Sequence, residues 1–189
     1  MQEHFDQNFD NNLEEIAFPV VQDLEKEKNS EKDEKSALIS ELSIKGYQKL
    51  KANSLNEARE FFEKILELDT DNNYALVGLG DTERKQENFQ EAIKFYSRCL
   101  EFHPDNNYAL FGLADCYKAL RQFTKAIEIW EKYLVHDEKN ITVITRIADA
   151  YRKIHSYRKS AELYQQILKM EETNAYALVG LGHLNFDLK

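Results

Sequence analysis

The chain has 189 residues, of which 42% are hydrophobic and 31% are charged, with only six glycines and two prolines. This composition excludes a collagen-like or Pro/Gly-rich chain and is typical of a helical globular protein. The net charge of −9 argues against nucleic acid and anionic membrane surfaces as partners, because both require a basic face.

The first 36 residues differ in charge from the rest. They hold eleven Asp or Glu and four Lys, a charge of −7, which leaves −2 of the total −9 for the remaining residues. We therefore predict an acidic leader over 1–36, disordered or partly helical, before an array over 37–189. An apolar island, "NLEEIAFPVVQDL" (12–24), either docks on the array or has no role.

The N-terminal sequence also bears on location. "MQEHFDQNFDNN" has neither the basic start nor the apolar run of a secretory signal. No window approaches 18 uninterrupted apolar residues, so we expect no membrane span and a cytoplasmic protein.

One stretch of the sequence occurs three times. "DNNYALVGLGD" (71–81) returns as "DNNYALFGLAD" (105–115) and as "TNAYALVGLGH" (173–183). Tyr74 and Tyr108 are 34 residues apart, and Tyr108 and Tyr176 are twice that distance apart. A constant period of this size indicates stacked supersecondary units. The predicted repeats are 39–72, 73–106, 107–140 and 141–174, followed by a partial repeat, 175–189.

Residue types recur at set positions when each repeat is numbered from its first residue. The eighth position is small: Gly46, Gly80, Ala114, Ala148 and Gly182. The twenty-fourth is aromatic: Phe62, Tyr96, Trp130 and Tyr164. We interpret the small residues as points of close helix contact and the aromatics as fillers between neighbours.

Each repeat contains two helical patterns. The second pattern of the second repeat places apolar residues at i, i+3, i+4 and i+7 from Phe89. Ser54 with Glu57, and Asn88 with Glu91, predict capping boxes at the start of the second helices. Cys99 and Cys116 lie within the helical patterns without CxxC spacing, so we interpret both as packing residues in a reducing compartment.

The columns resemble the tetratricopeptide repeat family. The matching residues are Leu79, Gly80, Ala92, Tyr96 and Pro104 in the second repeat, and Leu113, Ala114, Tyr117, Ala126 and Trp130 in the third. The resemblance implies an all-α, right-handed superhelix of antiparallel helix pairs, about four and a half repeats long. It also implies a concave groove lined by the first helix of each pair.

The turn inside each repeat departs from the family, which usually has Gly there. Here the residues are Asn53, Glu87, Arg121 and His155. Asn tolerates a left-handed conformation, whereas the other three predict a different turn or some strain.

By the same resemblance, the second, fifth, sixth, ninth and twelfth positions face the groove. The candidate contacts are Tyr74, Val77, Asp81, Tyr108, Phe111, Asp115 and Arg146. Glycines at the sixth position would let a bound backbone come close. We therefore expect a protein-interaction scaffold that binds a peptide or helix of another protein.

Two of these columns have alternative readings. Asp81, Asp115 and Asp149 either select a basic ligand or pair with the basic residue three positions later, and we favour the pairing. The repeated tyrosines indicate either binding or recent duplication. The clamp with which one branch of the family binds chaperone C-termini is excluded, because Ser43 and Tyr47 replace its Lys and Asn.

No pattern of catalytic, cofactor-binding or metal-binding residues stands out. The histidines are isolated, and "GLGD" has neither the preceding strand nor the following Gly-Lys of a phosphate loop. We expect a protein that is not an enzyme and has no cofactor or metal.

The partial repeat, 175–189, offers a first helix without its second, and its sequence is too apolar for a terminal cap. We favour a natural chain that continues beyond Lys189. The alternative function is a structural or oligomerisation segment of a longer protein, which self-associates through 175–189 or contacts an attached domain.

Overall fold

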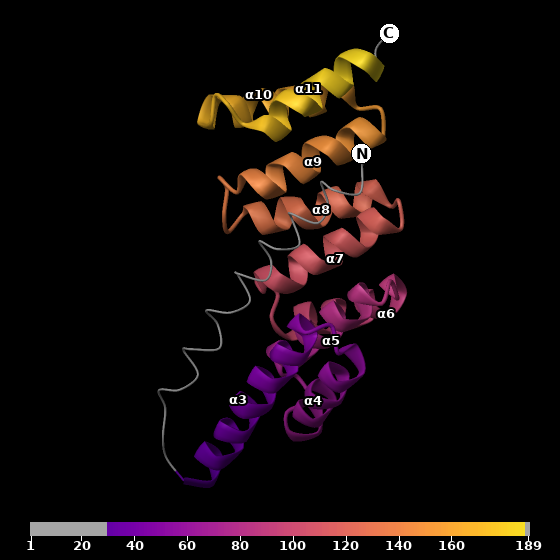
Figure 1. The fold of residues 1–189 in the computed structure, drawn as a ribbon. Helices are drawn as coiled ribbons and strands as arrows, with labels where there is room; N and C mark the ends of the chain where they lie inside the picture. Colours follow the sequence, from indigo (N-terminus) through magenta and orange to yellow (C-terminus); the bar gives the residue numbers. More distant parts are fainter. Residues whose placement is uncertain (1–29, 188–189) are drawn as a thin grey trace.

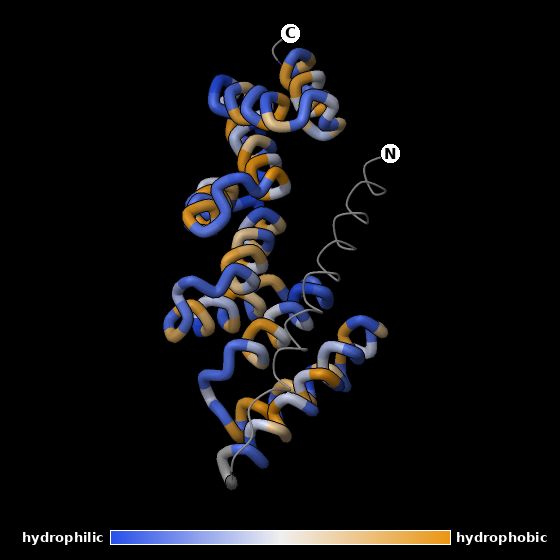
Figure 2. Tube along the Cα trace, turned by 90° about the vertical axis from the view of Figure 1, so that its left-hand side faces the viewer, coloured by the Kyte–Doolittle hydropathy of each residue, from blue (hydrophilic) through white to orange (hydrophobic). Residues whose placement is uncertain are grey.

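The computed structural model describes residues 30–187, and every regular element within that range is an α-helix (Figure 1). The helices are α3 (Ser30–Lys51), α4 (Leu55–Leu68), α5 (Asn73–Lys85), α6 (Phe89–Phe102), α7 (Asn107–Ala119), α8 (Phe123–Leu134), α9 (Ile141–Lys153), α10 (Tyr157–Met170) and α11 (Ala175–Asp187). They form pairs that are stacked along one direction, and Figure 2 shows the elongated stack from the side. The predicted all-α solenoid is confirmed.

The predicted period coincides with the helix starts. α5, α7, α9 and α11 begin at residues 73, 107, 141 and 175, the first residues of the predicted repeats. The first repeat is different, because α3 starts at Ser30 and passes the predicted leader boundary at residue 36 without a break. The apolar island and its proposed docking lie outside the described residues.

Asparagine side chains cap the first helices of the repeats. The Oδ1 atom of each capping Asn accepts a hydrogen bond from the backbone N–H three residues later, at 2.9–3.1 Å. The caps are Asn72, Asn106, Asn140 and Asn174. Each satisfies a backbone donor that the helix leaves unpaired. The Asn before the first helix of each of these repeats therefore marks the start of that helix.

The capping boxes predicted for the second helices are wrong. Neither Ser54 nor Asn88 makes a side-chain cap hydrogen bond. The Asn88 side chain instead donates to Glu83 Oε2 at 3.0 Å. The second helices begin directly after a tight turn, so the geometry of that turn sets their start.

The turn within each repeat has the same conformation throughout. Asn53, Glu87, Arg121 and His155 all have φ near +60°. In the third repeat, Arg121 N–H donates to the Lys118 carbonyl at 2.9 Å, and Gln122 N–H donates to the Tyr117 carbonyl at 2.8 Å. This is a Schellman motif, and the other three turns repeat both bonds. Of the two alternatives predicted for Glu87, Arg121 and His155, a different turn is wrong, and the strained, left-handed backbone without glycine is present.

Aromatic rings hold successive helices together. The Tyr96 ring lies against Gly80 of its own repeat and Gly112 of the next, and a Cβ added at Gly80 would be 2.6 Å from the ring. Phe62 lies in the same way against Gly46 and Gly78. The sixth-position glycines are therefore occupied from within, and the prediction that they admit a bound backbone is wrong.

Both cysteines belong to the core. Cys99 and Cys116 are free, fully buried and part of one apolar cluster with Tyr96. Burial raises the pKa of Cys99 to about 11 and that of Cys116 to about 12, so both thiols are protonated at neutral pH. Their predicted role as packing residues is confirmed.

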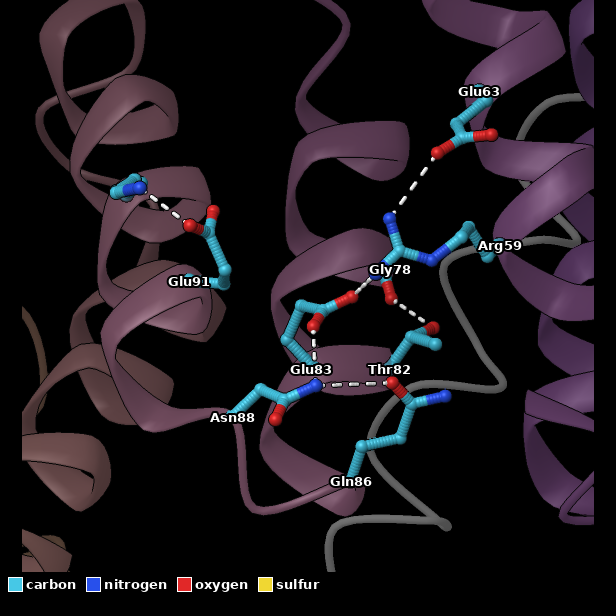
Figure 3. Close-up of polar contacts among 9 residues, drawn as sticks. Arg59, Glu63, Gly78, Thr82, Glu83, Gln86, Asn88 and Glu91 are labelled. Atoms are coloured by element: carbon cyan, nitrogen blue, oxygen red, sulfur yellow. Dashed lines mark hydrogen bonds and ion pairs between the residues drawn. The ribbon is translucent and has the colours of Figure 1, made fainter. Parts of the chain in front are cut away.

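A buried ion pair joins the first two repeats (Figure 3). Glu83 of α5 is 1% exposed and contacts Arg59 of α4, whose side chain is 35% exposed and also pairs with Glu63 at 3.2 Å. The same two positions hold Tyr117 and Ile93 in other repeats. The pair thus replaces an apolar contact.

We expect Arg121→Gly to raise the free energy of unfolding by about 0.5–1 kcal/mol, because glycine removes the Cβ penalty of a left-handed residue. Urea unfolding would measure it. Arg121→Ala, which keeps the Cβ, should bring no gain, and equal stabilisation by both variants would contradict the explanation.

Arg59→Met should lower the free energy of unfolding by about 1–3 kcal/mol, because it leaves the buried Glu83 carboxylate without its cation. The double variant Arg59→Met/Glu83→Leu should recover most of the loss, since an apolar pair can replace a buried ion pair. Thermal and urea unfolding test this, and additive losses in the double variant would contradict it.

Candidate functional site

The first helices of successive repeats lie side by side. α3 contacts α5, α5 contacts α7, and α9 contacts α11, as Figure 1 shows for the stack. α7 and α9 are less closely packed than α5 and α7. We call the surface formed by α3, α5, α7, α9 and α11 the first-helix face.

The structure places most of the predicted contact residues at the edge of the core. Tyr74, Tyr108 and Phe111 are partly exposed on α5 and α7. Val77 is only 6% exposed and packs in the apolar cluster that contains Tyr96, because the next helix covers it. Val77 therefore belongs to the core rather than to a binding surface, and its prediction is corrected.

The aspartate column has partners inside the protein. Asp81 accepts hydrogen bonds from the Tyr96 hydroxyl at 2.6 Å and from Arg84 at 3.2 Å, so the favoured pairing within the helix is present there. Asp149 accepts instead from the Tyr164 hydroxyl at 2.5 Å, and Arg152 donates to Asp187 at 2.9 Å, so the prediction that Asp149 pairs with Arg152 is wrong. Each of these two carboxylates thus has a hydrogen-bond partner within the fold.

Tyr96 and Tyr164, which hydrogen-bond to these aspartates, remain protonated and act as donors. Burial, followed by the charge of the neighbouring aspartate, raises the pKa of both Tyr96 and Tyr164 well above the usual value for a phenol. Each hydroxyl therefore donates a charge-assisted hydrogen bond to the aspartate of its own repeat, on the first helix.

The third repeat departs from this arrangement. Its twenty-fourth residue is Trp130, which has no hydroxyl to offer Asp115. Arg146 of the fourth repeat supplies the missing donor at 2.6 Å, and it occupies the sixth position, where three other repeats have glycine. The two substitutions thus compensate each other.

Other residues that depart from the repeat pattern lie near Arg146. Tyr133 occupies the twenty-seventh position, where Ile65, Cys99 and Ile167 are fully buried. Its ring meets Phe111 edge-on, with the centroids 6.1 Å apart. The Arg146 guanidinium lies 4.8 Å from the centroid of the Phe111 ring, within cation–π range.

We call Phe111, Asp115, Tyr133 and Arg146 the seam cluster, after the seam between the third and fourth repeats. The sequence predicted three of these residues as contacts and missed Tyr133. The signal that could have found it is its departure from an otherwise apolar column.

Two tyrosines of the third repeat, Tyr108 and Tyr133, have raised pKa values. Burial and the neighbouring Tyr74 raise the pKa of Tyr108. Burial, Asp137 and Tyr108 in turn raise that of Tyr133.

The two charged residues of the seam cluster balance each other. Arg146 and Asp115 are only 10% and 12% exposed and neutralise each other. Within residues 30–187, no group of three or more His, Cys, Asp or Glu is arranged to hold a metal ion. The surface offers aromatic rings and phenol hydroxyls, which suit apolar side chains and peptide groups.

Arg146→Gly should lower the free energy of unfolding by about 1–3 kcal/mol, because Asp115 loses its partner. In a Trp130→Tyr background the same change should cost less, since a tyrosine hydroxyl can then serve Asp115 as Tyr96 serves Asp81. A double-mutant cycle from urea unfolding measures this coupling. Additive effects would contradict the compensation.

Known proteins resemble the chain in sequence pattern and in fold. Two family models, each described as Tetratricopeptide repeat, match residues 45–107 and 83–143. No curated protein matches the chain in sequence. No helix in the described part of the chain has both the length and the apolar character to cross a membrane.

Solved structures share the fold at low identity. A tetratricopeptide repeat protein from Parabacteroides merdae aligns with a TM-score of 0.72 and 23% identity over 78% of this chain and 59% of its own. MamA from Desulfovibrio magneticus aligns at 0.73 with 15% identity, over 79% and 85% of the two chains.

YrrB, described as a TPR protein with an unusual peptide-binding site, aligns at 0.66 with 18% identity, over 74% and 72%. The chain thus spans less than two thirds of the Parabacteroides protein and most of the other two. Together with the matches of the family models and the stacked helix pairs, these likenesses lead to one conclusion: the chain belongs to the tetratricopeptide repeat family.

Proposed function

We propose that the chain is a protein-interaction scaffold that binds a peptide or helix of a partner protein on the first-helix face. Its main contacts there are Tyr108 and the seam cluster, to which the neighbouring helix α8 contributes Tyr133. The residues that depart from the repeat pattern lie together in the seam cluster, and this supports the proposal. Packing explains the residues that recur in every repeat. Phe111, Tyr133 and Arg146, in contrast, differ from the residues at the same positions of the other repeats.

The chemistry of the surface indicates the kind of segment that fits. Aromatic rings with polar tips bury apolar side chains and also hydrogen-bond to a peptide backbone. The internal pairing of Asp115 with Arg146 leaves no net charge to select a strongly basic or acidic ligand. We therefore expect a partner segment with apolar or aromatic anchors.

This role is that of a binding module rather than an enzyme. The net charge of −9 disfavours nucleic acid as the partner. Both cysteines of the chain are free thiols, which is in line with the reducing environment of the cytoplasm. YrrB, which shares the fold, is described as having an unusual peptide-binding site, and this makes a peptide ligand a reasonable first candidate here.

Selection of a displayed random peptide library on the full chain tests the proposal. A peptide enriched on the wild type should bind the Tyr108→Ser/Phe111→Ser variant at least ten-fold more weakly, as expected when central aromatic contacts are lost. Fluorescence anisotropy with the labelled peptide gives the affinities.

Phe102→Ser provides the matched control. Phe102 is 50% exposed at the end of α6, outside the first-helix face, so its loss should leave the affinity unchanged. Circular dichroism verifies that the variants keep their helicity. If no peptide is enriched, or if every selected peptide binds both proteins equally, the proposed site is wrong.

A further inference from the structure

The turns of the stack divide its charge between two edges. The turns between repeats carry mostly acidic residues: Asp69, Asp71, Asp105, Asp137, Glu138, Glu171 and Glu172. The turns within the third and fourth repeats are basic, because residues 116–127 and 150–161 contain seven Lys or Arg and no Asp or Glu. These two turns lie on the same side of the stack (Figure 1). They are neighbours, because α8 packs against α9 and the Tyr151 hydroxyl near the end of α9 donates to Glu131 of α8 at 3.2 Å.

Six of the seven basic residues form a surface that we call the basic edge: Lys118, Arg121, Lys125, Lys153, Arg158 and Lys159. Lys118 is partly exposed and the other five are exposed. The seventh, Arg152, is bound to Asp187 at 2.9 Å. Lys118 and Lys153 lie in the last turns of α7 and α9, where the helix dipole favours a cation.

The lysines at the start of the second helices have no such explanation. The third residue of these helices is Glu57 in α4 and Glu91 in α6, but Lys125 in α8 and Lys159 in α10. A carboxylate in the first turn is favoured by the helix dipole, whereas a cation there is disfavoured. In the first repeat, Glu57 also forms an ion pair with Lys49 at 2.6 Å. The third and fourth repeats give up both interactions.

Tyrosine rings hold these two lysines in place without neutralising them. At the position of Lys49, the third and fourth repeats have Tyr117 and Tyr151. The Nζ atom of Lys125 lies 5.2 Å from the centroid of the Tyr117 ring, and that of Lys159 lies 4.9 Å from the centroid of the Tyr151 ring. These are cation–π contacts, which orient an ammonium group and leave its positive charge available to an anion.

The carboxylates near the basic edge do not neutralise it. Asp115, three residues before Lys118, is bonded to Arg146 at 2.6 Å. Arg158 pairs with Glu162 at 2.9 Å, but both side chains are exposed, so this pair is weak. Within residues 30–187, no carboxylate forms an ion pair with the other five residues of the basic edge.

We propose that the basic edge binds an acidic segment of a partner protein. The surface is short, because the turn of the second repeat carries Glu87 and Glu91, the opposite edge is acidic and the whole chain has a net charge of −9. A long polyanion such as nucleic acid, or an anionic membrane, would extend past the two turns and meet like charge. A short acidic peptide would not, since salt screens charges beyond about 10 Å.

This surface is separate from the first-helix face and takes a different ligand. The first-helix face offers aromatic rings to apolar anchors, whereas the basic edge offers cations to carboxylates. The proposal therefore does not depend on the function proposed above.

The acidic segment at the start of this chain is a poorer occupant. Residues 1–29 contain eight Asp or Glu and two Lys. They are attached to α3 at Ser30, whereas the turn within the first repeat follows the other end of this helix, at Lys51. A helix of 22 residues is about 33 Å long. The attachment point therefore lies at the opposite edge of the stack and in the first repeat, away from the third and fourth.

Fluorescence anisotropy with a labelled octaglutamate peptide and the full chain tests the proposal. The peptide should bind, and added salt should weaken the binding. Lys125→Glu/Lys159→Glu should bind the peptide about ten-fold more weakly, because two attractive charges become repulsive. This variant restores the residue type of the first two repeats at both positions, so its thermal stability should not fall.

Lys64→Glu/Lys94→Glu is the matched control, since it makes the same change of charge on α4 and α6 and should bind the peptide almost as well as the wild type. The proposal would be overturned by no binding, by equal losses in the two double variants, or by tighter binding of anionic vesicles or of single-stranded RNA of equal charge. Carbodiimide cross-linking of the dilute chain provides a further test. A cross-link from a carboxylate of residues 1–29 to Lys125 or Lys159 would assign the surface to the chain itself and also overturn the proposal.

Discussion

The fold depends on one recurring contact, in which an aromatic ring lies against small residues of neighbouring helices. The Tyr96 ring fills the space beside Gly80 and Gly112, and the Phe62 ring fills the space beside Gly46 and Gly78. The absence of a Cβ brings the first helices together, and the ring excludes the void that would otherwise remain. Because each ring contacts its own repeat and the next, the same contact joins the helices within a pair and the pairs within the stack.

Where the ring is a tyrosine, its hydroxyl group links the packed core to the aspartates at the surface. Where the ring is Tyr96 or Tyr164, its hydroxyl reaches the aspartate on the first helix of its repeat. Trp130 interrupts this connection, and the stack compensates with Arg146. The long Arg146 side chain stands where glycine would allow close packing, and α7 and α9 are accordingly less tightly packed. The seam is thus both the weakest point of the regular pattern and the place where aromatic side chains gather.

The same contact explains the end of the stack. Gly182 has the position of Gly80 but has no ring against it, and Leu178 is exposed where Leu76 is buried. A solenoid has no intrinsic stopping point, since every repeat presents the surface that the next one covers. The exposed face of α11 is therefore a direct consequence of the repeat.

The sequence by itself determined the all-α class, the 34-residue period, the helix starts from Asn73 onward and the aromatic and glycine columns. These features are local or strictly periodic, so a single chain shows them without coordinates. It did not determine which partner each polar group takes. Asn88 bonds to Glu83 instead of capping its helix, Asp115 pairs with Arg146, and Val77 is covered by a neighbouring helix. Only the tertiary structure decided these, because each depends on how far apart two helices pack, and that distance is set by side chains many residues away in the sequence.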